Sequence, residues 1–178
     1  MAPSIALPRP SPAFWAAVGR FAPLVLLGVA VVLLVAAEFS TLREIKAVTV
    51  VPEGGLTKGG DHHGYALAVI SVAALVMGFG AWRGGSRPAA VAVVALGAAA
   101  LAIVLLIDLP SLDDTGLIGR NYDLAEAHPS TGFWLELVGA VALLASGLLL
   151  LRGGVVRARE RSEARERRRG EARAVRES

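Results

Sequence analysis

The chain has 178 residues, of which 54% are hydrophobic and 19% charged, and its formal net charge is +3 at pH 7. It has no cysteine, which excludes disulfide-stabilised folds, thiolate ligands and thiol nucleophiles. The hydrophobic residues gather in long uncharged runs, and too little polar chain remains to enclose them in a water-soluble domain. The composition therefore indicates a membrane protein, and its preference for Arg, Ala, Gly and Val is typical of bacterial genomes rich in G and C.

Four nearly uncharged runs predict an all-α membrane fold, a four-helix transmembrane bundle. They cover residues 21–37, 65–82, 89–107 and 133–151. At about 1.5 Å per residue each helix would be about 26–29 Å long, close to the thickness of the hydrocarbon core of a bilayer. The transmembrane domain is thus expected over residues 21–151, with outer loops at 38–64 and 108–132.

Residues 1–20 precede the first helix and carry four prolines within "MAPSIALPRPSP". This composition predicts a disordered cytoplasmic tail. The first apolar run could instead belong to a cleaved signal peptide, because Val35-Ala36-Ala37 resembles a cleavage site. The run is longer than the usual core of about 7–15 residues, so we expect the helix to be retained.

The first outer loop contains "EIKAVTVV", from Glu44 to Val51, before Pro52. Its Val and Ile content makes it the one predicted strand of the chain. Because a lone strand is only marginally stable, we expect a partner, for which "TGLIG" in the second outer loop is the candidate.

Small residues recur four positions apart in the second, third and fourth helices, where they would let helix backbones approach closely in lipid. The pairs are Ala74–Gly78, Ala95–Ala99, Ala98–Ala102 and Ala142–Ser146. For the alanine pairs, the general abundance of alanine is the alternative explanation.

Basic residues predict the orientation, because loops rich in Lys and Arg stay in the cytoplasm. With both termini inside, the cytoplasmic side holds Arg9, Arg20, Arg83, Arg87 and the ten arginines of residues 152–178. The outer loops hold only Arg43, Lys46, Lys58 and Arg120. We therefore expect a multi-pass protein of the plasma membrane with both termini cytoplasmic.

Histidines and acids in the outer loops form a candidate metal site, since imidazole and carboxylate bind zinc or copper and histidine can also sense protons. The candidates are Asp61, His62, His63, Asp123, Glu126 and His128. Neighbouring His62 and His63 would point about 100° apart on a helix, and no H-x-x-x-H or H-E-x-x-H spacing occurs. The alternative is that these groups only keep the helix ends in water.

Asp61 lies at the outer end of the second helix. The first, third and fourth helices also carry an acid at that end: Glu38, Asp108 and Glu136. Glu136 is the one charge within an apolar run, about 4–5 Å below the outer boundary. An ionisable group in the membrane is a functional hypothesis. An acid near a helix N-terminus also suits the helix dipole, so both roles stay open.

The tail, residues 152–178, holds ten arginines and five glutamates. It is expected to be a disordered cytoplasmic tail or a solvated helix interrupted at Gly170. Arginines next to the membrane should contact anionic lipid headgroups; these are Arg152, Arg157, Arg159 and Arg161. Without interleaved aromatic residues for base stacking, no specific nucleic acid is expected.

Two functions are open after these exclusions. No nucleotide-binding, serine-hydrolase or zinc-protease motif occurs, so neither an enzyme nor a cofactor is predicted. The first function is a non-enzymatic accessory, assembly or interaction subunit with a homo- or hetero-oligomeric membrane partner. The alternative is a small transporter or sensor that binds a cation or protons at the outer face through His62, His63, His128 and neighbouring acids. Carriers coupled to protons usually place an ionisable residue at mid-membrane, and these spans have none.

The four runs, together with "GFWLELVGAV" at the start of the last one, resemble the small four-helix integral membrane proteins of actinobacterial type. This resemblance implies a four-helix membrane fold, and the group has no established activity that could be transferred.

Overall fold

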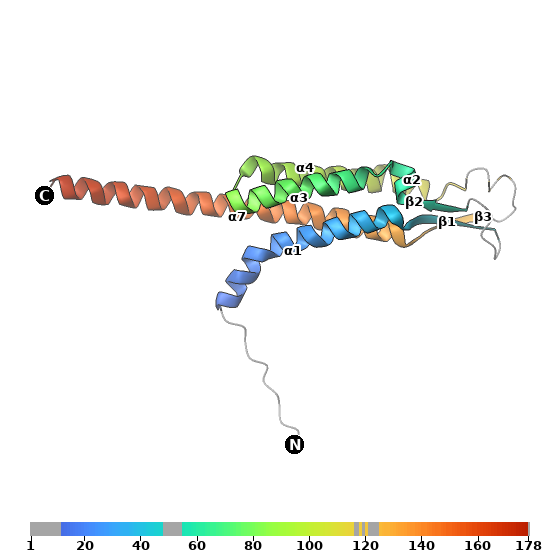
Figure 1. The fold of residues 1–178 in the computed structure, drawn as a ribbon, viewed down its shortest axis with the longest axis horizontal. Helices are drawn as coiled ribbons and strands as arrows, with labels where there is room; N and C mark the ends of the chain where they lie inside the picture. The colour runs from blue at the N-terminus through green and yellow to red at the C-terminus, as the bar shows by residue number, and fades with distance from the viewer. Residues whose placement is uncertain (1–11, 48–54, 116–117, 119, 121–124, 178) are drawn as a thin grey trace, which may run out of the picture.

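The computed structural model describes residues 12–47, 55–115, 118, 120 and 125–177, and the backbone alone for residues 12–18, 20, 47 and 155–177. Four long helices lie side by side (Figure 1): α1 (Pro12–Phe39), α3 (Ala66–Gly84), α4 (Arg87–Ile103) and α7 (Thr131–Glu177). A π-helical turn, η1 (Val104–Asp108), and a short turn, α5 (Leu109–Ser111), continue α4 directly.

Four helical segments are long and apolar enough to cross a membrane, the third formed by α4 together with η1 and α5, which confirms the four predicted apolar helices. The segments are Phe21–Phe39, Ala66–Gly84, Arg87–Ser111 and Thr131–Gly154. Leu27, Leu34 and Leu143 fill the centre of the bundle, whereas Val32 and Leu106 are exposed on its outside. An apolar exterior is what helices surrounded by lipid require.

Both ends of the chain are more helical than expected. Residues 12–20, predicted as part of a disordered tail, form the first turns of α1. Proline costs no hydrogen bond at the first turn of a helix, so Pro12 begins α1; residues 1–11 lie outside the described residues. At the other end α7 continues through Gly170 to Glu177. One glycine costs only about 1 kcal/mol relative to alanine, which is not enough to interrupt a long helix.

Glycines allow the helices to approach closely. A Cβ on Gly97 of α4 would lie 2.7 Å from the backbone nitrogen of Leu144 in α7, and a Cβ on Gly147 would lie 2.8 Å from the backbone nitrogen of Val94. Of the predicted small-residue pairs, Ala74–Gly78 and Ala142–Ser146 are buried in the bundle. The pairs Ala95–Ala99 and Ala98–Ala102 are exposed on α4, which agrees with the alternative explanation for the alanine pairs, the general abundance of alanine.

A three-stranded antiparallel sheet stands at one end of the bundle, in the order β2-β1-β3 (Figure 1). β1 (Thr41–Ala47) follows α1 and pairs with β2 (Leu56–Lys58) and β3 (Ala125–Pro129). We call this end, which also carries the short helix α2 (Gly59–His63), the sheet end.

The predicted strand at Glu44–Val51 exists but begins earlier, at Thr41, and residues 48–51 lie outside the described residues. β2 and β3 lie on the two sides of β1 within Thr41–Ala47. Of the expected partner, Thr115–Gly119, residues 116, 117 and 119 lie outside the described residues. β2 leads directly into α2, and β3 precedes α7 by one residue. Packing of the helices therefore brings β2 and β3 beside β1.

Candidate functional site

Glu38 lies in the last turn of α1 and is 1% exposed. Its Oε1 accepts hydrogen bonds from the backbone nitrogens of Leu67, at 2.8 Å, and Ala68, at 3.3 Å. These are among the first amides of α3, which have no partner within their own helix. The residue before α3, Tyr65, provides no side-chain cap. A carboxylate from α1 therefore caps α3 and suits the positive end of its dipole.

The short helix α2 packs tightly against the ends of α1 and α7. A Cβ on Gly59 would lie 2.8 Å from Glu136 Oε1 and 2.9 Å from the carbonyl oxygen of Ala37. Only glycine allows this approach. Gly64 then ends α2 in the left-handed conformation, at φ 59°, which glycine adopts without strain. The tight turn brings His62 and His63 to the junction of the long helices.

Asp108 continues the buried face of α4 into the π-helical turn. The buried positions of α4 and η1 recur at steps of three and four residues, at Ala90, Val93, Gly97, Ala100 and Val104. Asp108 follows Val104 by four residues and is 0% exposed, whereas Ile107 is exposed. The face of the helix that packs into the bundle therefore ends in a carboxylate.

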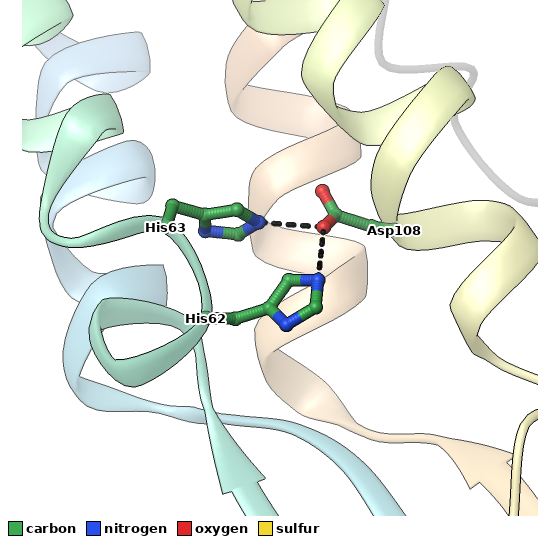
Figure 2. Close-up of side chains that lie close together, drawn as sticks. All are labelled: His62, His63 and Asp108. Atoms are coloured by element: carbon green, nitrogen blue, oxygen red, sulfur yellow. Dashed lines mark hydrogen bonds and ion pairs between the residues drawn. The ribbon is translucent and has the colours of Figure 1, made fainter.

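Both histidines reach the same oxygen of Asp108 from two sides, as Figure 2 shows. Nε2 of His63 lies 2.5 Å from Asp108 Oδ1, and Nε2 of His62 lies 3.6 Å from it. The His63 side chain is 3% exposed, whereas that of His62 is 27% exposed and connects the group to solvent. The side chains of neighbouring residues on a helix point in different directions. Both rings nevertheless reach Asp108, because its carboxylate lies between them.

Glu136 completes the group from the first turns of α7. It is 0% exposed, and its Oε1 lies 3.9 Å from Nδ1 of His63. Neither of its carboxylate oxygens makes a hydrogen bond within the described part of the chain, nor do Nδ1 of His63, Oδ2 of Asp108 and Oε2 of Glu38. Buried polar groups in proteins are nearly always hydrogen-bonded, so five such atoms at one place are unusual. We call Glu38, His62, His63, Asp108 and Glu136 the polar cluster.

The two imidazoles differ in electrostatic environment. Burial lowers the pKa of His62, and the neighbouring His63 and Arg43 also lower it against the opposing charge of Asp108. Burial acts to lower the pKa of His63 as well, but the hydrogen bond to Asp108 and the charges of Asp108, Glu136 and Glu38 raise it overall. The interior of the polar cluster therefore favours a positive charge.

Of the six residues predicted as a metal site, His62 and His63 enter the polar cluster. Asp61 is exposed on α2. His128 and Glu126 are exposed on β3, where they lie 3.6 Å apart as a separate pair. Asp123 lies outside the described residues.

The three acids predicted at the helix ends, Glu38, Asp108 and Glu136, all lie in the polar cluster. What sequence reasoning missed is that they converge on His63. Their shared position, at the same end of three helices, was the signal that could have shown it.

The tail arginines stand apart from the polar cluster. Arg152 is exposed at the end of the apolar part of α7. Arg157, Arg159 and Arg161 follow on the same helix, for which the backbone alone is described. Their contact with anionic lipid stays a prediction.

Comparison with known proteins finds no matching family model, no matching curated protein and no matching solved structure.

Proposed function

We propose that the protein is an integral membrane protein of the plasma membrane that binds a cation at its sheet end and serves as a non-enzymatic sensor subunit. Both termini are cytoplasmic in this proposal, and the sheet end faces outward. The four apolar segments and the excess of arginine at the opposite end support this arrangement.

One observation carries the proposal: three carboxylates, each at most 1% exposed, meet around one imidazole. Ionising all three acids around one imidazole would leave buried charge uncompensated, which costs several kcal/mol even after the protein relaxes. Arg43, whose charge acts on His62, donates instead to the carbonyl oxygens of Ser111 and Asp114. A cation bound among the carboxylates would offset this cost and give the unpaired oxygens a partner.

A sensor is favoured over a transporter because the polar cluster is confined to one end of the bundle. Farther along the described spans, the buried polar side chains are Ser71 and Ser146. Both hydroxyls donate to backbone carbonyls, of Leu67 at 2.7 Å and of Pro23 at 2.8 Å. Neither is free to pass a cation along the bundle.

The cluster also offers a means of signalling, because its members come from α1, α2, η1 and α7. A bound cation would hold these four elements together and fix the position of the sheet. The proposal keeps the accessory subunit predicted from the sequence. A membrane partner would bind the sheet end in the position that the cation fixes, and the tail arginines would contact anionic lipid.

Thermal unfolding of the full chain in detergent tests the proposal. We expect a cation among Zn²⁺, Ni²⁺, Ca²⁺, Mg²⁺ and Na⁺ to raise the Tm, since a ligand at 100 times its Kd stabilises by about 2.7 kcal/mol. The double variant Asp108→Asn/Glu136→Gln should lose this increase. Glu126→Gln, which alters an exposed acid on β3, is the matched control and should keep it. A Tm that no cation changes, or that rises equally in the double variant, would contradict the proposal.

Reporters fused to the two termini test the orientation separately. Both should be active in the cytoplasm, because the arginines flank the helices on that side. Activity of either reporter outside the cytoplasm would overturn the assigned orientation.

A further inference from the structure

We infer that the cation is a divalent transition metal of the zinc type, bound by Nε2 of His62, Nε2 of His63 and a carboxylate oxygen of Asp108. The inference rests on the proposed function and adds the chemical class of the ligand and the atoms that hold it.

The three ligand atoms are already close together. One atom from each of His62, His63 and Asp108 lies within 4.8 Å of the others, and Figure 2 shows both rings directed at the carboxylate. Zinc bonds of about 2.0–2.1 Å in a tetrahedral arrangement would separate ligand atoms by about 3.3 Å. His63 would move away from Asp108, from 2.5 Å, and His62 would move slightly closer, from 3.6 Å. The two imidazole nitrogens, at most 4.8 Å apart, would have to lie at a similar separation.

The types of ligand select the metal. Two imidazoles with one carboxylate suit zinc and neighbouring divalent metals, whereas Ca²⁺ and Mg²⁺ prefer shells of oxygen. The chain has no cysteine, so it lacks the thiolates that favour Cu(I). Three protein ligands leave a fourth position for water or for a donor from a partner, as in open zinc sites.

Glu136 supports His63 as a positioning residue. Histidine ligands usually donate the N–H of their second nitrogen to a carboxylate, which orients the ring and leaves the other nitrogen for the metal. Nδ1 of His63 has no hydrogen-bond partner within the described residues and faces Glu136 Oε1 at 3.9 Å. Both oxygens of Glu136 are likewise unpartnered and fully buried. The pair of His63 Nδ1 and Glu136 Oε1 includes none of the three ligand atoms. It is the arrangement expected when Nε2 of the same ring binds a metal.

Charge and access also agree with a metal. The cluster contains three buried carboxylates, whereas the guanidinium of Arg43 is engaged by Ser111 and Asp114. His62 is partly exposed at the surface of the sheet end and gives an ion a route from solvent to Asp108.

Calorimetric titration of the full chain in detergent, after treatment with a chelator, tests the inference. We expect one Zn²⁺ per chain and much weaker or no binding of Ca²⁺ and Mg²⁺. His62→Ala should weaken Zn²⁺ binding more than about 100-fold, because even the loss of an outer partner costs about 10–100-fold. Glu136→Gln, which alters an outer partner of His63, should weaken Zn²⁺ binding by about 10–100-fold.

His128→Ala is the matched control, since it removes an imidazole that lies outside the polar cluster, and it should bind Zn²⁺ like the wild type. His62 is partly exposed, so its replacement leaves the packing intact, and an unchanged elution volume in gel filtration verifies the fold. Equal Zn²⁺ affinity in wild type and His62→Ala would overturn the inference. Binding of Ca²⁺, Mg²⁺ or Na⁺ alone would overturn it while leaving the proposed function in place. Absence of any cation binding would overturn both.

Discussion

The middle of the bundle and its sheet end treat buried polar groups in opposite ways. In the middle, Ser71 and Ser146 each place a hydroxyl on a backbone carbonyl, so their polar atoms are satisfied. At the sheet end, Glu38, Asp108 and Glu136 bury carboxylates with oxygens that find no donor among the described residues. The two serines and the three acids are all at most 1% exposed, so burial alone does not explain the difference.

Under the proposed function, this difference separates polar groups that serve only the fold from polar groups that also bind a ligand. A hydroxyl that donates a hydrogen bond to a helix carbonyl is tolerated in lipid at little cost. A buried carboxylate oxygen without a partner is costly. Glu38 and Asp108 each have one such oxygen among the described residues and Glu136 has two, which is expected where a cation compensates them. The predictions below act on one region while the other serves as its control.

The largest effect should come from Asp108→Asn, which keeps the shape of the side chain but removes the charge of the ligand that both histidines approach. We expect Zn²⁺ affinity to fall more than about 100-fold, beyond the range for outer partners. Calorimetric titration measures this loss. Ser71→Ala, a change in the middle of the bundle, should leave the affinity unchanged; a comparable loss in Ser71→Ala would remove the distinction between the two regions.

A steric change in the middle of the bundle should lower stability without changing the metal site. Gly97→Ala places a Cβ 2.7 Å from the backbone of Leu144, and overpacking of this kind costs about 1–3 kcal/mol. Gly80→Ala in α3 meets nothing within 4 Å and should be neutral or slightly stabilising, because alanine favours helices. Thermal unfolding in detergent compares the two. Equal Tm values would contradict the close packing of α4 on α7.

The smallest effect should come from Ser146→Ala, which removes a hydrogen bond between α7 and α1. Such bonds between membrane helices contribute about 0.6 kcal/mol on average. Ser71→Ala should cost less, since the Ser71 hydroxyl bonds to a carbonyl four residues earlier in its own helix. A denaturation series in mixed micelles can resolve the two. A larger loss for Ser71→Ala would reverse their assigned roles.

The parts of the fold that depend on composition could be predicted from the sequence. Hydrophobic runs predicted four helices, and Val and Ile near Glu44 predicted a strand, because these signals are local. The strand partners could not be predicted, since the helix packing decides which segments lie beside β1. The prolines before the first apolar run predicted disorder, so the helical start at Pro12 was missed. Proline breaks a helix only beyond its first turn, and Pro12 is the first residue of α1.

The sequence predicted the residues of the polar cluster but not that they lie together. Glu38, Asp108, Glu136 and both histidines were recognised near helix ends, but their convergence depends on packing that spacing does not reveal. The close approach at Gly59 brings α2 against Glu136. Tertiary packing, which no single segment encodes, decides which side chains meet.

X-ray absorption at the zinc edge of the zinc-loaded full chain tests the central claim most directly. The polar cluster predicts a first shell that contains two imidazole nitrogens and a carboxylate oxygen at about 2.0–2.1 Å, and one imidazole fewer in His62→Ala. A shell of oxygens alone, or a spectrum that His62→Ala and His63→Ala leave unchanged, would contradict it.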